Sequence, residues 1–243
     1  MSIAAYLQTE LVALSNEARR KYPEIKEGSI EVVLKTLNDI MSHGVEIQLK
    51  ILQTILPLLT NYNVHAESLA EALLLCFRLQ DSRVVFVNNT AAATLRQLVI
   101  YIFEKVGDED IAKQKSAASE SQTQAKSEIK DQVESTQENE EQLGPCALDA
   151  YLLFQDLCLL TNSEQARFLN LGSISRTFGL ELIESVLTNH FHLFKQHKEF
   201  ASLLRERVCP LIIKNFSDKH DFPQTMRLMR VVYILIKQFH EIL

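Results

Sequence analysis

The sequence has few of the residues from which most catalytic and nucleotide-binding sites are built. Its 243 residues include no tryptophan, six glycines, five prolines and four cysteines. The patterns G-x-x-x-x-G-K-[ST], G-x-G-x-x-G and G-x-S-x-G are all absent, so neither a phosphate-binding loop nor a nucleophile elbow is predicted. Scarce glycine also disfavours a sheet with many tight turns and favours helices.

Compartment and membrane signals are equally sparse. None of the four cysteines forms a C-x-x-C pair, and all lie in or beside apolar helical patterns, which fits a reducing cytosolic compartment better than a disulfide framework. The amino terminus lacks the basic start and apolar run of a signal peptide. No stretch reaches ~18 uninterrupted apolar residues, so only peripheral membrane association is expected.

The negative charge is concentrated in one segment. Residues 107–143 hold ten of the 31 acidic and four of the 25 basic residues, which leaves 21 of each sign elsewhere. No block rich in lysine and arginine points to nucleic acid. The segment is also poor in apolar residues, so it is predicted to be a disordered acidic linker. It is read as a solvated spacer, with a specific docking motif as the alternative.

Apolar residues elsewhere recur with the period of an amphipathic helix. Pro57 is expected to kink its helix or split off the last turn. The segment 83–89, RVVFVNN, is read as a connection, and Asn89 as the N-cap of a packing helix that ends at Val106. Helices are predicted over 2–20, 29–42, 45–60, 66–79, 89–106, 145–160, 173–189, 197–216 and from 223 to the end.

These helices predict an all-α fold. Consecutive helices joined by short connections commonly pack as antiparallel pairs in an α-solenoid. No exact sequence period is visible, so a diverged, armadillo-like stack is expected. The predicted organisation is a helical region over 1–106, the acidic linker over 107–143, and a second helical region over 144–243.

Reactive side chains do not form a recognisable catalytic or metal-binding pattern. His190, His192 and His197 lie two, five and seven residues apart, whereas ligands on one helix face need spacings of three or four. Cys158 and Cys209 read as small apolar residues without a histidine at a known motif spacing. No catalytic residue, metal or cofactor is therefore expected.

Six runs, in order along the chain, resemble a known family. They closely match the amino-terminal part of the Mon-two (monensin-sensitivity) family, relatives of the large Arf guanine-nucleotide exchange factors. The runs are LLLCFRL (Leu73–Leu79), NNTAAATLRQLV (Asn88–Val99), DAYLLFQDLC (Asp149–Cys158), SRTFGLELIESVL (Ser175–Leu187), ERVCPLIIK (Glu206–Lys214) and MRLMRVVYILIKQF (Met226–Phe239).

The resemblance implies a dimerisation and cyclophilin-binding region followed by the start of the homology-upstream-of-Sec-seven region. Family members are helical scaffolds at the cytosolic face of the trans-Golgi network and endosomes, and this branch lacks the exchange domain. The implied partners are a Dopey-type scaffold, an aminophospholipid flippase and Arf-like GTPases, together with self-association of the first region. Between Glu27 and Ser29 that region looks shortened, and the chain stops before an NYDCD-like box of the second region.

Two functional hypotheses follow. The first is a non-enzymatic scaffold fragment in vesicle trafficking, and the second is a regulatory module acting on the nucleotide cycle of an Arf-like GTPase. Exposed candidates for the GTPase contact are Arg96, Gln97 and Arg176. Glu181 and Glu184, spaced i, i+3, are read as a solvated face or a partner contact rather than an acid–base pair.

Overall fold

The protein is described from a computed structural model, which places residues 28–123, 143–217 and 221–243. Within these ranges the regular structure is helical, without strands, so the predicted all-α helical-repeat fold is confirmed. The helix predicted over 2–20 lies outside the described residues. The helices are α2 (Gly28–Ile40), α3 (Val45–Asn61), α4 (Ala66–Gln80), α5 (Val85–Thr123), α6 (Pro145–Thr161), α7 (Arg176–Asn189), α8 (Phe191–Gln196), α9 (Lys198–Leu203), the π-helix η2 (Leu204–Val208), α10 (Cys209–Ser217) and α11 (Phe222–Phe239).

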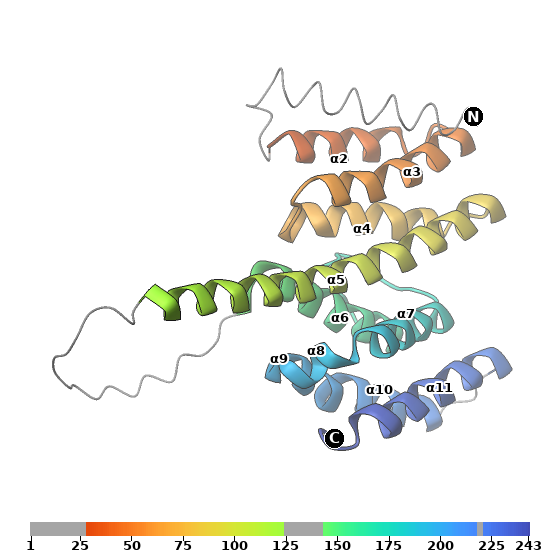
Figure 1. The fold of residues 1–243 in the computed structure, drawn as a ribbon. Helices are drawn as coiled ribbons and strands as arrows, with labels where there is room; N and C mark the ends of the chain where they lie inside the picture. The colour runs from red at the N-terminus through yellow and green to blue at the C-terminus, as the bar shows by residue number, and fades with distance from the viewer. Residues whose placement is uncertain (1–27, 124–142, 218–220) are drawn as a thin grey trace, which may run out of the picture.

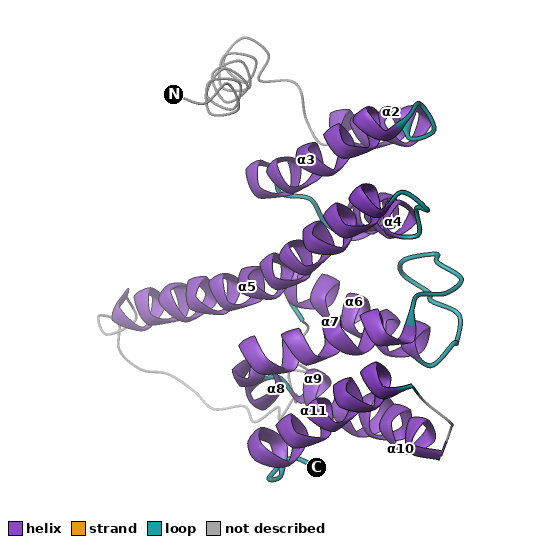
Figure 2. Cartoon of the chain, turned by 90° about the vertical axis from the view of Figure 1, so that its right-hand side faces the viewer, coloured by secondary structure: helices purple, strands orange, loops and turns teal. Residues whose placement is uncertain are grey.

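The helices form a stack that follows chain order. Figure 1 shows α2 at one end and α11 at the other, with α5 across the middle, and Figure 2 shows the same stack from the side. α5 packs against α3 and α4 on one side and against α6 and α7 on the other. This long helix therefore belongs to both halves of the molecule.

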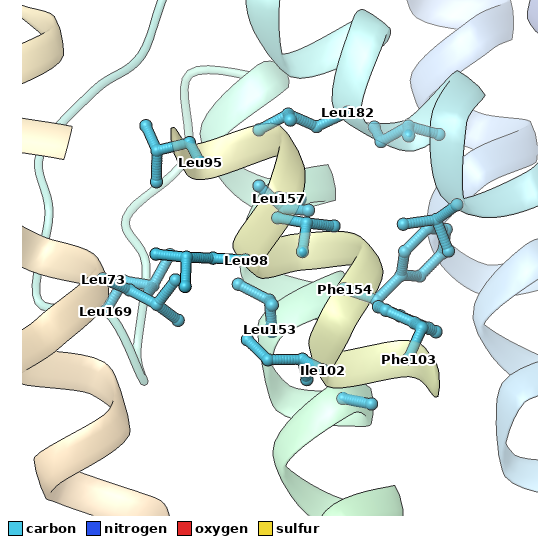
Figure 3. Packing of buried hydrophobic residues seen from close by; sticks show 14 of the residues in the cluster. Leu73, Leu95, Leu98, Ile102, Phe103, Leu153, Phe154, Leu157, Leu169 and Leu182 are labelled. Carbon is cyan, nitrogen blue, oxygen red and sulfur yellow. The ribbon is translucent and has the colours of Figure 1, made fainter. Parts of the chain in front are cut away.

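The buried stripe of α5 joins the two halves into one core. Leu95, Leu98, Ile102 and Phe103 lie toward leucines and phenylalanines of α4, α6 and α7 (Figure 3). Earlier in the helix, Ala91 is fully buried and Ala92 nearly so, while Ala93 is exposed. Removing this apolar surface from water is the main favourable contribution to folding.

Phe103 is the centre of an aromatic cluster. Its ring centroid lies 6.2 Å from that of Phe154 in α6, 6.5 Å from Phe194 in α8 and 6.1 Å from Phe200 in α9. Phe194 in turn contacts Phe239 of α11, with centroids 5.8 Å apart. Such offset and edge-to-face pairs add stability beyond the area that they bury. One side chain of α5 is thus linked, through rings, to four later helices.

The interpretation of 83–89 as a connection is wrong, because α5 begins at Val85 and includes Asn89. The turn before it is held by Ser82, whose hydroxyl accepts the Val84 N–H at 3.2 Å. Asn88 donates its amide to the Gln80 carbonyl, and Val87 is fully buried. This segment, rich in β-branched residues, therefore forms the start of α5, because tertiary packing outweighs its β propensity, which depends strongly on context.

Residues 107–123 of the predicted linker are helical, because α5 continues from Gly107 to Thr123. Glu109 and Asp110, in the first turn beyond Val106, bond to groups of the second helical region. The composition is low in apolar residues but rich in good helix formers such as alanine, lysine, glutamate and glutamine. The predicted linker residues 124–142 lie outside the described part of the chain.

The two internal prolines have different effects. α3 continues through Pro57, so its last turn is not split off. Pro57 and Gln53 are exposed, so a carbonyl without a helical partner can bond to water there. Pro210 follows a π-helical turn, in which the Cys209 N–H reaches the Leu204 carbonyl. The wider turn gives the proline ring room against the preceding turn, as at other helix irregularities.

A glycine in α7 allows close approach to α6, and this contact gives a stability prediction. A Cβ built on buried Gly179 would lie 2.1 Å from Thr161 Oγ1 and 2.9 Å from Ile174 Cδ1. Gly179→Ala should therefore lower the free energy of unfolding by about 1–3 kcal/mol through overpacking. Gly107→Ala is the matched control, because its Cβ would meet nothing within 4 Å in a helix interior, and it should raise stability by about 0.5–1 kcal/mol. Urea titrations followed by circular dichroism measure both; equal effects would contradict this packing.

Buried His190 predicts how stability depends on pH. Burial, and then the neighbouring His192, lower the pKa of His190 below its ordinary value of 6.5, and its ring packs 5.6 Å from Phe103. The unfolded chain therefore takes up a proton at a pH where the folded chain does not. Above about pH 6.5, His190 is neutral in both the folded and the unfolded chain and does not reduce stability. Below that value, proton uptake by the unfolded chain lowers the free energy of unfolding as the pH drops.

The change to test is His190→Phe, which keeps an aromatic ring and removes the proton-binding group. Between about pH 7.5 and 5.5, the wild-type chain should lose up to about 1 kcal/mol more stability than the variant. Urea titrations at both pH values measure the difference. A variant with the wild-type pH dependence would show that this histidine is already solvated in the folded chain.

Candidate functional site

No set of described side chains gathers into a reactive centre. A groove of about 490 Å³ lies between α2 and α4, with leucines and scattered charges along it. Arg78 in this groove donates to Asn38 Oδ1 at 3.0 Å. Among residues 28–123, 143–217 and 221–243, no cluster of three or more histidine, cysteine, aspartate or glutamate side chains could hold a metal ion.

The three histidines singled out by the sequence face different surroundings. His190 is buried against Phe103, and its Nε2 has no hydrogen-bond partner within the described ranges. His192 is exposed, while His197 Nε2 lies 2.8 Å from Asp110 Oδ2. The ring of His190 therefore has a packing role, and the ring of His197 has a polar one.

The cysteines are not activated for nucleophilic attack. Burial raises the pKa of Cys76 to about 12, and it raises the pKa of Cys158 still further. Burial also raises the pKa of Cys209 above its ordinary value. Since the thiolate is the reactive form, these environments suppress rather than promote reaction.

Three of the five candidate contact residues lie in an ion-pair network between α5, α7 and α11. Arg227 Nη2 lies 3.2 Å from Glu181 Oε2, and Arg227 Nη1 lies 2.8 Å from Glu184 Oε2. Arg230 Nη1 is 3.6 Å from Glu184 Oε1, and Arg96 pairs with Glu181. Because these side chains are partly exposed, each pair contributes modestly to stability, but together they align three helices.

The surroundings of Arg96, Gln97 and Arg176 differ. Arg96 also lies over the ring of Phe178, 5.4 Å from its centroid, and its side chain is 40% exposed. Gln97, next to it on α5, is exposed. Arg176 is half-buried at the start of α7 and has contacts of its own. The face around Arg96 and Gln97 is accessible, and the partner-contact role of all five residues stays a prediction.

A second polar set, which sequence reasoning missed, ties the two halves together. Asp149 of α6 accepts the Ala66 N–H at 3.0 Å and lies 2.7 Å from His65 Nδ1. Glu109 of α5 accepts the Ala147 N–H at 3.1 Å, and its carboxylate lies where a side chain on Gly144 would be. A carboxylate at a helix amino terminus meets unpaired N–H groups and a favourable dipole. Local spacing could not reveal these contacts, because their partners are 38 to 84 residues apart.

Asp156 fixes the connection between α6 and α7. This fully buried carboxylate accepts N–H groups of Arg167, Phe168 and Leu169 at 3.0, 2.7 and 2.7 Å. Charge-assisted hydrogen bonds to three successive amides offset much of the cost of burying the charge. The role of Asp156 is therefore to order the loop, not to perform acid–base chemistry.

Asp149 gives a test of the junction. Asp149→Ala removes both acceptors from His65 and the Ala66 N–H, so it should cost about 1–3 kcal/mol of unfolding free energy. Asp149→Asn keeps one acceptor oxygen and should cost less. Exposed Asp81, after α4, is the control, and Asp81→Ala should change stability by less than about 0.5 kcal/mol. Denaturant titration measures all three; an alanine variant at 149 as stable as wild type would contradict the assigned role.

Comparison with known proteins assigns both helical regions. Residues 27–110 match the Mon2/Sec7/BIG1-like dimerisation and cyclophilin-binding domain. Residues 146–243 match the Mon2/Sec7/BIG1-like HUS domain. α5 begins inside the first match and extends past its end, while α6 to α11 lie within or at the edge of the second.

Curated relatives extend the similarity over nearly the whole chain. The chain is 42% identical over 255 aligned positions to the MON2 homolog of Xenopus laevis and 40% identical to that of Homo sapiens, with 97% of the chain covered in both. The MON2 homolog of Drosophila melanogaster is 40% identical over 233 positions that cover 87% of the chain. The chain spans about 14% of the length of the first two relatives and 13% of the third.

The two domain matches follow one another in a single stack and come from the same family. Together with the MON2 homologs, they show that the chain belongs to the Mon2/Sec7/BIG1-like family and carries its dimerisation and cyclophilin-binding domain and its HUS domain.

Proposed function

We propose that this chain is a non-enzymatic scaffold that acts in vesicle trafficking at the Golgi apparatus and endosomes by binding proteins through its helical faces. The observation that carries the proposal is the shared core: two domains of a trafficking-related family are joined by α5 into one rigid support. A support of this kind suits presentation of surfaces, because side chains on packed helices hold their relative positions.

Family resemblance gives the partners that we propose. They are a Dopey-type scaffold, a flippase complex and an Arf-like GTPase, with a second copy of the chain as a further partner of the first domain. The name of that domain, dimerisation and cyclophilin-binding, supports protein interaction in general. None of the described helices is long and apolar enough to span a bilayer. Attachment at the cytosolic face of these membranes is proposed to be peripheral.

The accessible face around Arg96 and Gln97 is the proposed contact surface for the GTPase. Gln97 offers an exposed amide, and Arg96 presents a partly exposed guanidinium that Glu181 and Phe178 hold in place. A preordered arginine loses less side-chain entropy on binding than a free one. In the alternative function, this face alters the nucleotide cycle of the GTPase through the same residues. Measured rates of nucleotide release distinguish that function from simple binding.

The test is chemical cross-linking of the purified chain to cytosol in the presence of Golgi membranes, followed by identification of the partners. Wild-type chain should capture trafficking proteins of the three proposed kinds. Gln97→Arg should reduce GTPase capture at least about tenfold, because a larger, charged side chain disrupts a fitted interface. Gln53→Arg makes the same change on an exposed position of α3 and should leave capture unchanged.

Nucleotide release from purified Arf-like GTPases distinguishes the two functions. A scaffold leaves the release rate unchanged at saturating concentrations, whereas a regulatory module changes it in the wild type and not in Gln97→Arg. Recovery of no trafficking protein by a chain with the expected helical circular dichroism would overturn the scaffold proposal.

A further inference from the structure

The connection between α4 and α5 exposes three consecutive large apolar side chains. Phe86 is 76% exposed, Val85 70% and Val84 38%, whereas the next residue, Val87, is fully buried. Together the three expose on the order of 300 Å² of apolar surface, which is the size of the largest apolar patch on many monomers. We call these three residues, Val84 to Phe86, the α5 wedge. The wedge lies inside the first domain match, between two helices that both pack on further helices of the stack.

The wedge lies on an edge of the stack that is made of connections. Figure 2 shows the α2–α3, α4–α5 and α6–α7 connections in one column along this edge, and Figure 1 shows α4 ending and α5 beginning at its right-hand margin. Arg78 near the end of α4 donates to Asn38 Oδ1 near the end of α2 at 3.0 Å, so the ends of these two helices lie together. The helices meet the edge end-on, and a flat surface laid against it would touch the connections rather than the sides of helices.

The spacing within the wedge favours a fluid apolar medium over a protein helix. Successive residues at the start of a helix point about 100° apart, so the three side chains spread around the beginning of α5. A partner helix covers residues that recur at spacings of three and four along one side. It would therefore cover one residue of the wedge and leave the others in water. The interfacial region of a lipid bilayer can surround all three.

Charged residues beside the wedge fit the headgroup layer of a bilayer. Arg83 directly precedes the wedge and is exposed, as is Arg78 in the last turn of α4, while exposed Asp81 offsets one of these charges. A basic side chain next to an apolar tip meets lipid phosphate when the tip enters the interface. Val45, which begins α3 on the same edge, is 41% exposed and adds a second apolar point beside Glu46. The positive excess is small, so burial of the wedge is the main attraction and charge is secondary.

We propose that the α5 wedge inserts into the interfacial region of a lipid bilayer and is a point at which this chain touches the membrane, with Arg83 against a lipid phosphate. This inference rests on the proposed function, because it gives the proposed peripheral attachment a defined surface and a lipid ligand. It also orients the chain. Gln97 lies about 18 Å further along α5 than Val85, so the proposed GTPase contact face stays close to the membrane without entering it.

The sequence contains no tryptophan, which makes the wedge directly observable. Phe86→Trp in the full chain places a single indole at the tip, and its emission should shift to the blue and be quenched by brominated phosphatidylcholine when vesicles are added. Phe191→Trp is the matched control, because Phe191 begins α8, is 40% exposed and lies toward the opposite side of the stack (Figure 1); its emission should not change. The wedge offers less apolar surface than one myristoyl chain, so binding is measured at about 1–10 mM lipid.

Flotation with vesicles of equal phosphatidylcholine and phosphatidylserine separates the contributions. The double variant Val85→Ser, Phe86→Ser should reduce vesicle-bound protein at least about tenfold with unchanged helical circular dichroism, because both side chains are exposed in the folded chain. Arg83→Gln should weaken binding to these vesicles about fivefold and leave binding to phosphatidylcholine alone unchanged. Val32→Ser, at a position of α2 that is 64% exposed, is the control and should change neither.

Two results would overturn the inference directly: an emission of Phe86→Trp that vesicles do not change, or a double variant that floats like the wild type. A dimer in light scattering that the double variant dissolves would assign the wedge to a second copy. Loss of a cross-linked protein in membrane-free cytosol, in the double variant alone, would assign it to a protein partner.

The proposed function is tested separately by cross-linking of the wild-type chain in membrane-free cytosol. Failure to bind vesicles with successful capture of trafficking proteins rejects only this inference. Vesicle binding through the wedge without capture of any trafficking protein rejects only the scaffold proposal.

Discussion

Burial of one side of α5 against helices from both halves is the constraint on which the rest of the structure depends. Phe103 is fully buried, and its ring is in contact range of rings from α6, α8 and α9. Tyr101, on the same helix, donates its hydroxyl to the Leu59 carbonyl of α3 at 3.1 Å. Neighbouring residues of one helix therefore contact helices of both halves, and neither domain has an independent core at this point.

Polar contacts refine this arrangement without providing most of its energy. Asp149 and Glu109 satisfy backbone N–H groups at the starts of α4 and α6, where helices leave donors unpaired. Asp156 does the same for a loop. Because each carboxylate accepts from atoms far away in sequence or in another element, these residues specify which helix lies beside which. The apolar core alone would tolerate more than one alignment.

Much of the fold could be predicted from periodicity, because an amphipathic helix leaves its 3.6-residue pattern in the sequence. That is why the bounds of α3, α4 and α6 fall within a residue or two of the predicted ones. The predicted helix start at Asn89 and the predicted linker start at residue 107 are wrong, because a local capping preference and a low content of apolar residues count for little beside tertiary contacts, here those of Asn88, Glu109 and Asp110. The contacts of the candidate site are harder to predict from the sequence than the helices. Glu181 and Glu184 were recognised as a pair, but their arginine partners on α11 are more than 40 residues away and could not be found from spacing.

The position of α5 in both domains also determines how the molecule responds to force. A force applied to α3 or α4 along the axis of α5 would act directly on the packing of the aromatic rings around Phe103, because α5 contacts α3, α4 and these rings without an intervening hinge. Tension applied to the first domain would therefore strain the aromatic cluster and would not simply rotate one domain about the next.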